Sequence, residues 1–320
     1  MASLGSDIQQ AKKILEAGAL VAIPTETVYG LAGNALNPLA VAKIFEVKNR
    51  PFFDPLIVHV ASWQKVNQYA HDIPNQAKIL ADHFWPGPLT LLLNKKENIP
   101  DLVTAGLDRV GLRCPQHPLT LALLKDISFP MAAPSANPFG YVSPTTAQHV
   151  QDQLGEKISY ILDGGSCEIG IESTVIGWED DLPVVYRLGG VNLEQIESII
   201  GPVKVLPHST SQPHAPGQLK SHYAPRKKFL LGNLKDLAVI HGSKRTGVLA
   251  FQNKIEGIPL NLQLVLSPTG DLKEAARNLF SMLREFDTMD IEMVFAEEVP
   301  NEGLGRAIND RLRRAAAANN

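Results

Sequence analysis

The segment 48–60, KNRPFFDPLIVHV, carries two cations, a carboxylate and an imidazole close to two prolines. Lys48 and Arg50 come at the end of a helical pattern, and the apolar stretch LIVHV follows at once. A Lys-x-Arg pair beside a rigid turn offers one compact ammonium and one planar guanidinium fork, which together can hold phosphate oxygens. The alternative interpretation is a solvated surface pair of little energetic weight.

Other polar side chains stand inside apolar segments. In PTETVYG (24–30), we expect Thr25, Thr27 and Tyr29 on one face of a strand, where they could hydrogen-bond a small polar ligand. A solvent-facing row of good strand formers is the alternative. Arg109 and Arg113 flank an apolar strand. Since arginine is costly to bury without a partner, these two point to anionic ligands or to internal carboxylates.

The loop segment 133–144, APSANPFGYVSP, offers Ser135, Asn137 and Ser143 among prolines and a glycine. Small hydroxyl and amide groups on such a turn can bring backbone N–H groups to a phosphate, although an ordinary capped turn has the same composition. Ser173 stands in the apolar segment ESTVI, and Arg187 precedes two glycines. Neither of these last two motifs is diagnostic by itself.

Composition narrows the class of protein. The 320 residues are 44% hydrophobic and 20% charged, which is ordinary for a globular chain. A net charge of -3 argues against nucleic-acid binding through bulk charge. Two cysteines, Cys114 and Cys167, are too few for a disulfide framework or a zinc knuckle, so we expect a cytoplasmic protein. Without a signal pattern or an apolar run of about 18 residues, no membrane association is expected.

The periodicities predict many short strands and fewer helices. Ser6 is the expected cap of a first helix, and Asn37 with Pro38 marks the start of a second. Strands are expected at 56–60, 89–94, 110–114, 158–165, 172–178 and 184–190. This mixture indicates an α/β fold of the mixed α+β kind, without the regular alternation of a doubly wound sheet.

A composition shift after Gly201 separates a second region. The segment 207–225 is rich in Pro, Ser, His and Gln and reads as a linker or an ordered loop; its histidines lack matching acidic or cysteine ligands, so no metal site is expected. Strands are expected at 228–232, 238–242, 247–252, 263–267 and 291–299, with an amphipathic helix at 271–287 and a closing helix at 305–316. We therefore predict a domain at 1–203, a linker at 204–226 and a small three-layer α/β domain at 227–320.

Taken in order, PTETVYGL, KNRPFFDPLIVH, FWPGPLTLLL, GLRCP, APSAN, ESTVI and RLGG resemble the YrdC-like family over residues 8–200. The segment APGQLKSHYAP (215–225) and the region after it are similar to the long form of that family, which carries an extra C-terminal domain. The resemblance implies a twisted sheet around a deep, positively lined cavity, followed by a Rossmann-like domain.

The resemblance also implies an activity. Such an enzyme, a nucleotidyltransferase, condenses L-threonine, bicarbonate or carbon dioxide, and ATP to threonylcarbamoyl-AMP and pyrophosphate. Magnesium is expected to arrive with ATP, without protein side chains as ligands and without an organic cofactor. The product would pass to a transferase that modifies an adenosine of tRNA, and weak RNA binding would fit that setting.

Site residues follow from the resemblance, position by position. The catalytic set would be Lys48, Arg50, Ser135 and Asn137; ATP would also meet Asp54, Arg109, Ser143, Arg187 and Tyr223; threonine would meet Thr27, His59, Arg113, the backbone of Ala133 and Ser173. Arg113 suits the threonine carboxylate, and Thr27 with Ser173 suits its hydroxyl. Asp54 would anchor the nucleotide or a neighbouring arginine, and Tyr223 would close over the cavity as a lid.

Two alternatives remain. Carbamoyltransferases on the same fold make a carbamoyl adenylate from carbamoyl phosphate, but those chains are expected to carry zinc-finger regions, and this sequence has no four-cysteine set. The other alternative is a non-catalytic module that binds double-stranded RNA. It would bind RNA with a steep salt dependence and would not need threonine.

Overall fold

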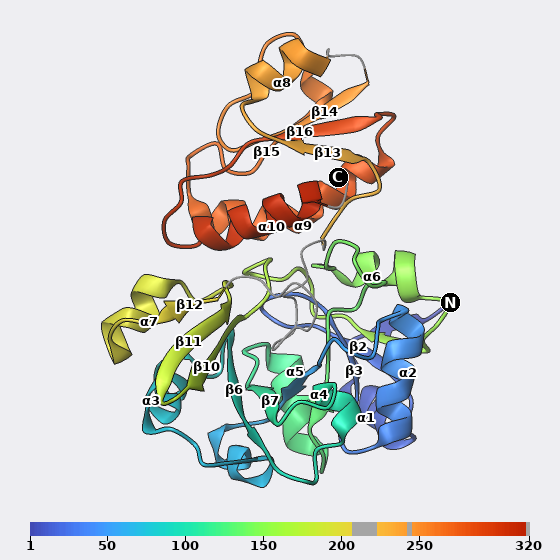
Figure 1. The fold of residues 1–320 in the computed structure, drawn as a ribbon. Helices are drawn as coiled ribbons and strands as arrows, with labels where there is room; N and C mark the ends of the chain where they lie inside the picture. Colours follow the sequence, from blue (N-terminus) through green and yellow to red (C-terminus); the bar gives the residue numbers. More distant parts are fainter. Residues whose placement is uncertain (207–222, 242–244, 318–320) are drawn as a thin grey trace. The chain divides into compact units, whose positions relative to one another are not determined.

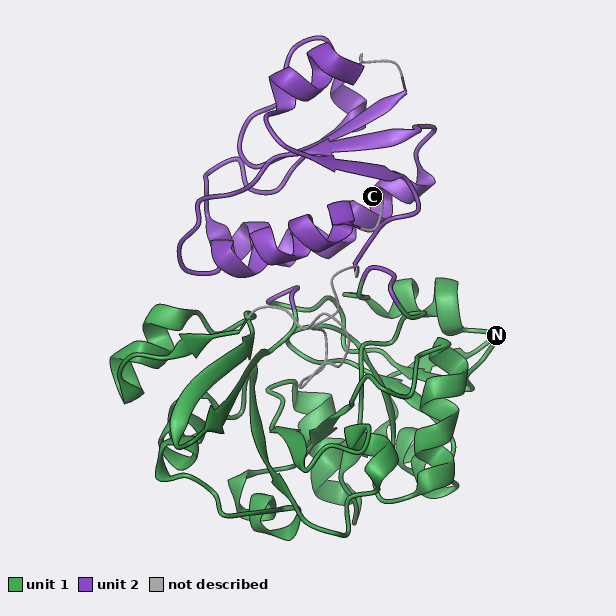
Figure 2. Ribbon diagram, viewed as in Figure 1, with its two compact units in different colours: residues 1–139, 143–168, 172–219 green, residues 140–142, 169–171, 220–320 purple. Residues whose placement is uncertain are grey.

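The computed structural model describes residues 1–206, 223–241 and 245–317, and these divide into two compact units. The first unit comprises residues 1–139, 143–168 and 172–219, and the second comprises 140–142, 169–171 and 220–320 (Figure 2). Two short segments of the N-terminal region therefore belong with the C-terminal unit. The three histidines of the predicted linker lie outside the described residues.

The first unit is built on a mixed sheet whose strands are spread over most of its sequence (Figure 1). The strands are β1 (Ser3–Gly5), β2 (Val21–Ile23), β3 (Gly30–Asn34), β4 (Ile57–His59), β5 (Ala70–His71), β6 (Leu89–Lys95), β7 (Arg109–Arg113), β8 (Met131–Ala132), β9 (Tyr160–Leu162), β10 (Thr174–Glu179), β11 (Leu182–Arg187) and β12 (Lys204–Val205). Their order is β1-β9-β2-β3-β8-β4-β7-β6-β10-β11-β12, and β5 pairs with β6. The sheet contains both parallel pairs, such as β4–β7, and antiparallel pairs, such as β6–β7, so the predicted mixed α/β fold is confirmed.

Helices connect these strands. They are α1 (Ile8–Glu16), α2 (Pro38–Lys48), α3 (Asn75–Phe84), α4 (Asp101–Thr104), α5 (Pro118–Asp126), α6 (Ala147–Leu154) and α7 (Leu193–Ile200), with a 3-10 turn η1 at Trp63–Gln68. As predicted, α2 begins with Asn37 as cap and Pro38 at its first position. The cap of α1 is Asp7 and not Ser6, because the Asp7 carboxylate accepts hydrogen bonds from two backbone N–H groups of the first turn.

Successive residues of one strand enter two different apolar clusters. Ala22 of β2 packs in one cluster with Leu31 and Phe45, whereas its neighbours Val21 and Ile23 pack in the other. Since alternate side chains of a strand point to opposite faces, the two clusters lie on the two faces of the sheet. Both faces are therefore covered, and polar groups at the strand ends are left to form a site.

The segment 24–29 is a turn between β2 and β3, so the expected strand with hydroxyls on one face is wrong. The Thr25 hydroxyl accepts hydrogen bonds from the backbone N–H groups of Thr27 and Val28, both at 3.2 Å, and donates to the Val28 carbonyl at 2.6 Å. Because the Thr25 hydroxyl forms hydrogen bonds with these backbone groups, they take the place of the hydrogen bonds that a strand would form with its neighbour.

The second unit has three layers. Its parallel strands β13 (Lys228–Leu231), β14 (Thr246–Ala250), β15 (Gln263–Val265) and β16 (Met293–Ala296) run in the order β13-β16-β14-β15. Helix α8 (Leu234–His241) covers one face, and α9 (Leu272–Glu285) and α10 (Gly305–Ala317) cover the other (Figure 1). The predicted three-layer domain is confirmed, but the strand expected at 238–242 is wrong. Residues up to His241 belong to α8, whose first turn is capped by the Asn233 side chain.

In the described part of the chain, none of the helices combines the length and the apolar composition needed to cross a bilayer.

Candidate active site

Lys48 joins the end of α2 to the loop that follows β8. Its side chain is 1% exposed, and Nζ donates to the carbonyl oxygens of Ser135 and Asn137, each at 2.5 Å. Burial, together with the charge of Arg50, lowers the pKa of the Lys48 ammonium well below its usual range. Three of the four residues predicted as catalytic, Lys48, Ser135 and Asn137, therefore lie together. The Lys48 ammonium holds the turn that carries Ser135 and Asn137.

Arg50 lies directly after α2, which ends at Lys48 because Asn49 adopts a left-handed conformation with φ 52°. The Arg50 Nε donates to the Asp54 carbonyl at 3.0 Å, and Nη2 donates to the Pro55 carbonyl at 2.8 Å. The same Nη2 lies 2.9 Å from the Asp54 carboxylate. Arg50 therefore fixes the loop between α2 and β4, and Asp54 is the partner of this neighbouring arginine.

His59 and Arg113 lie side by side at the ends of β4 and β7, where they are register partners. His59 is 3% exposed, and neither ring nitrogen has a hydrogen-bond partner among the described residues. Burial, and then the Arg113 charge, lowers the pKa of His59 to about 3. The imidazole is therefore neutral at physiological pH, with one N–H donor and one acceptor nitrogen.

Arg113 is held by several groups. Its Nη2 donates to Glu26 Oε1 at 2.6 Å and to Thr27 Oγ1 at 2.9 Å, and its Nε donates to the Gly87 carbonyl at 3.2 Å. Arg113 and Glu26 are 4% and 3% exposed. The sequence analysis did not identify Glu26. It did predict that the buried arginines could pair with internal carboxylates, and Glu26 is a partner of that kind.

A second polar group lies at the start of β10. Arg187 donates through Nε to the Ser173 carbonyl and through Nη2 to the Ser173 hydroxyl, both at 3.0 Å. The Thr90 and Ser173 hydroxyl oxygens are 2.8 Å apart, and the Ser143 hydroxyl donates to Glu172 Oε1 at 2.6 Å. All five residues are buried. Glu172 is the second acidic residue that the sequence reasoning missed.

The two groups share one edge of the sheet. The Gly87 N–H donates to the Cys114 carbonyl, just past β7, and the Thr174 N–H donates to the Pro88 carbonyl, just before β6. The end of β7 and the starts of β6 and β10 therefore lie next to one another. Ala133 follows β8 and donates its N–H to the Ile57 carbonyl at the start of β4.

Two further residues of the predicted nucleotide site have contacts of other kinds. Arg109 is at the opposite end of β7 from Arg113, about 13 Å away at the usual rise of a strand. Its Nη1 donates to the Tyr186 hydroxyl at 2.8 Å, and its guanidinium lies over the Tyr186 ring. Tyr223 belongs to the second unit, where its ring is 1% exposed and stacks on Phe280. The ATP contacts of Arg109 and Tyr223 stay predictions.

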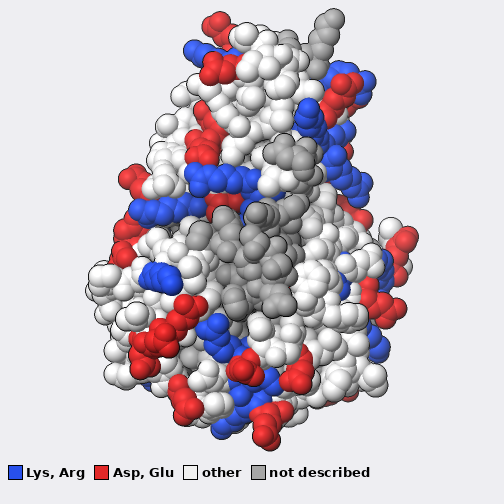
Figure 3. Space-filling model, viewed as in Figure 1, with Lys and Arg blue, Asp and Glu red and all other residues white. Residues whose placement is uncertain are grey.

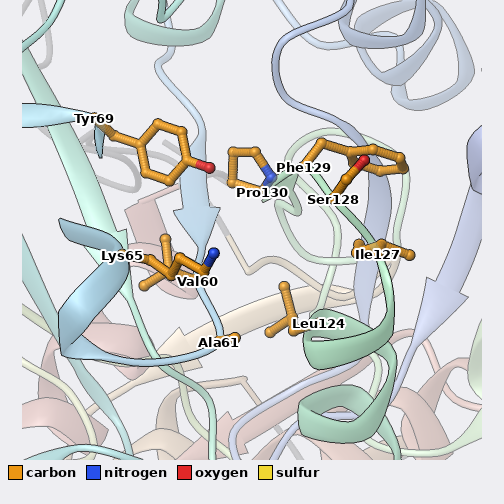
Figure 4. A pocket seen from close by; sticks show the side chains of 9 residues that line it. All are labelled: Val60, Ala61, Lys65, Tyr69, Leu124, Ile127, Ser128, Phe129 and Pro130. Atoms are coloured by element: carbon orange, nitrogen blue, oxygen red, sulfur yellow. The ribbon is translucent and has the colours of Figure 1, made fainter. Parts of the chain in front are cut away.

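A small cavity lies beside the end of β4 (Figure 4). It is lined by Val60, Ala61, Lys65, Tyr69, Leu124, Ile127, Ser128, Phe129 and Pro130. Its volume is about 20 Å³, far below the several hundred Å³ that an organic ligand needs. We therefore do not assign this cavity to the site.

Surface charge bears on the RNA-binding alternative. On the face drawn in Figure 3, Lys and Arg side chains are interspersed with Asp and Glu among the described residues of both units. Recognition of the phosphate backbone favours a basic surface, so the mixed pattern does not mark this face as a site for RNA.

Comparisons with known proteins identify the family of this chain. A family model described as "Telomere recombination" (Sua5_yciO_yrdC) matches residues 13–189, and the model "Threonylcarbamoyl-AMP synthase, C-terminal domain" matches residues 191–317. The threonylcarbamoyl-AMP synthase of Bacillus subtilis is 41% identical over 97% of this chain and 92% of its own length. The enzyme of the same name from Pyrococcus abyssi is 41% identical over 97% of this chain and 94% of its own length.

Solved structures show the same relationship. The crystal structure of Pyrococcus abyssi Sua5 complexed with L-threonine superposes with a TM-score of 0.90 at 40% identity, covering 98% of this chain and 94% of that one. A full-length HypF structure, at 23% identity and a TM-score of 0.52, shares the fold over 57% of this chain. The chain therefore belongs to the Sua5–YciO–YrdC family, in the long form that carries the threonylcarbamoyl-AMP synthase C-terminal domain.

Proposed function

We propose that this chain is a threonylcarbamoyl-AMP synthase, an enzyme of the nucleotidyltransferase class that condenses L-threonine, bicarbonate or carbon dioxide, and ATP. The observation that carries the proposal is the pair of buried guanidinium sites in one unit, Arg50 at the end of α2 and Arg113 at the end of β7. The near full-length similarity to enzymes of that name supports the same substrates. Two fixed cationic sites suit a reaction whose two anionic substrates are a nucleoside triphosphate and an amino acid that keeps its carboxylate.

The chemistry requires three anionic or polar partners to meet. The threonine amine adds to carbon dioxide and loses a proton, giving a carbamate. A carbamate oxygen then attacks the α-phosphorus of ATP, and pyrophosphate leaves. Because the protein forms no covalent bond in this scheme, catalysis is mainly positioning and charge neutralisation.

At the nucleotide end, Arg50 and Lys48 neutralise the triphosphate. Lys48 also holds the carbonyls of Ser135 and Asn137, so the ammonium sets the shape of the loop against which the phosphates bind. Ser143 and Arg187 complete this end of the site. Among the described residues, no group of three His, Cys, Asp or Glu side chains is placed to hold a metal ion, and we propose that magnesium is carried by the ATP phosphates.

At the amino acid end, Arg113 binds the threonine carboxylate, and the neutral His59 and the Ala133 backbone complete the pocket. Thr27 and Ser173 contact the side-chain hydroxyl of the substrate. A site built to hydrogen-bond a hydroxyl rejects valine, which would leave buried polar groups unpaired. Tyr223 acts as a lid that excludes water from the labile product. The product then passes, in the cytoplasm, to the transferase that modifies tRNA.

The direct test is a rapidly quenched mass-spectrometric assay with ATP, magnesium, bicarbonate and L-threonine. The expected signals are threonylcarbamoyl-AMP and pyrophosphate, with no product when threonine or bicarbonate is left out. A chain that binds ATP but forms product only from carbamoyl phosphate would be a carbamoyltransferase. A chain that forms neither product but binds double-stranded RNA with a steep salt dependence would be the non-catalytic module.

A further inference from the structure

We propose that Glu26 is a positioning residue for the amino acid substrate, which orients the Arg113 guanidinium so that its Nη1 edge meets the threonine carboxylate. The inference rests on the proposed function and deepens its threonine site. It concerns a residue that makes no direct contact with substrate and acts through Arg113.

The Glu26 carboxylate is itself fixed in place. One oxygen, Oε1, accepts from Arg113 Nη2 at 2.6 Å, and the other, Oε2, accepts from the Gln116 backbone N–H at 3.0 Å. Gln116 lies in the short connection between β7 and α5, so this anchor belongs to the backbone. With both oxygens engaged and the side chain 3% exposed, the carboxylate cannot turn without leaving a buried group unpaired.

The donors of Arg113 divide into used and available groups. A guanidinium has five N–H donors in a rigid plane. Nη2 uses two on Glu26 and Thr27, and Nε uses one on the Gly87 carbonyl. Nη1 has no acceptor among the described residues. Since the three contacts fix the plane, Nη1 is the edge that the protein presents to an incoming carboxylate.

Thr27 is oriented by the same arrangement. The Thr25 and Thr27 hydroxyl oxygens lie 2.8 Å apart, and the Thr27 N–H donates to the Thr25 hydroxyl at 3.2 Å. Thr27 accepts from Arg113 at the same time. The Thr27 hydroxyl is therefore held beside the Arg113 guanidinium, where it can contact a bound substrate. The substrate carboxylate and the substrate hydroxyl would thus meet two adjacent groups, Arg113 Nη1 and the Thr27 hydroxyl.

A simpler role for Glu26 is to neutralise a buried arginine. The two roles predict opposite effects when Glu26 is removed. Without a counter-charge, Arg113 attracts a carboxylate more strongly, so a neutralising role predicts a lower KM for threonine. Without the two contacts that fix the plane, Nη1 is no longer aimed, so a positioning role predicts a higher KM for threonine.

The experiment measures KM for threonine and for ATP, and kcat, in Glu26→Ala and Glu26→Gln. We expect Glu26→Ala to raise KM for threonine about tenfold or more, with KM for ATP changed less than about threefold. Glu26→Gln keeps an oxygen acceptor for Arg113 but sets an amide NH2 against the Gln116 N–H, so its KM should fall between wild type and Glu26→Ala.

Coupling and controls complete the test. In an Arg113→Ala background, Glu26→Ala should add less than about twofold, because a residue that acts through Arg113 has nothing left to orient. Glu298→Ala is the matched control, since Glu298 holds the exposed Arg313 of the second unit through two hydrogen bonds. It should leave both KM values unchanged.

Three results would overturn the proposal: a lower KM for threonine in either Glu26 variant, an equal rise in KM for ATP, or a full additive loss in the Arg113→Ala background. If Glu26→Ala does not fold, Glu26→Gln carries the comparison. Calorimetric titration of threonine into the same proteins keeps this test separate from that of the enzyme activity. A wild type that binds threonine but makes no adenylate contradicts the proposed function and still tests Glu26.

Discussion

Arg50 and Asp54 form a buried ion pair, with Nη2 of the guanidinium 2.9 Å from Oδ2 of the carboxylate. Asp54 is fully buried and Arg50 is 8% exposed. Arg50 also donates to two backbone carbonyls of the same loop. The residue proposed to hold the triphosphate is therefore also the residue that shapes the loop after α2, so substitutions here act on activity and on stability together.

We predict that Arg50→Ala abolishes adenylate formation and lowers the free energy of unfolding by about 3–5 kcal/mol, because it leaves the Asp54 carboxylate buried without its cation. The double variant Arg50→Ala/Asp54→Asn should recover much of the stability, since no buried charge remains, but none of the activity. Urea denaturation and the quenched adenylate assay measure the two quantities separately. Turnover in the double variant close to wild type would remove Arg50 from the nucleotide site.

Arg113→Ala should raise the threonine requirement far more than the ATP requirement. A charge-assisted hydrogen bond contributes about 1.5–3 kcal/mol, which corresponds to a rise of roughly 10- to 100-fold in KM for threonine. Steady-state kinetics with each substrate varied in turn measures the split. Arg245→Ala, which changes an exposed arginine paired with Asp290 in the second unit, serves as control. Equal effects on both substrates would argue against a carboxylate contact at Arg113.

Sequence patterns predicted the parts of the fold that depend on local order, and missed those that depend on distant partners. The cap Asn37, the strand β6 and the amphipathic helix α9 follow from spacing alone, and the structure has all three. Glu26 carries no such signal, because its importance comes from Arg113, which lies far away in sequence. The turn at Thr25 was mistaken for a strand because alternating threonines also suit strands, and only the hydroxyl contacts separate the two.

The Tyr223 ring should contribute strongly to the stability of the second unit. It stacks on Phe280 with ring centroids 5.5 Å apart, and the Arg311 guanidinium lies over it at 5.4 Å. We expect Tyr223→Ala to lower the free energy of unfolding by about 3–5 kcal/mol, the usual cost of emptying a large aromatic site, and Tyr223→Phe to cost much less. If Tyr223 also acts as the lid, the alanine variant loses turnover as well. Chemical denaturation and adenylate yield distinguish these two effects.

Deleting residues 207–320 should impair both turnover and stability. The segments 140–142 and 169–171 belong to the second unit, where Tyr141 pairs with Ala224 and its hydroxyl donates to Asp287. The truncated chain would expose these segments without their partners. We expect lower solubility and a lower midpoint of thermal unfolding, measured by calorimetry. A truncated chain with unchanged stability and turnover would contradict the roles proposed for Tyr141 in packing and for Tyr223 as a lid.

His59 should make stability depend on pH. Its pKa is lowered from 6.5 to about 3 in the folded state, chiefly by burial and then by Arg113. Below pH 6.5 the unfolded chain takes up a proton that the folded chain does not, so stability falls as pH falls, until the folded group titrates near pH 3. The loss approaches about 1.4 kcal/mol per pH unit within that window.

His59→Asn carries no titrating group at this position, so its unfolding free energy should fall less steeply over the same range. Urea denaturation of both proteins at several pH values measures the difference, and parallel curves would show that His59 accepts a proton in the folded state as readily as in the unfolded chain.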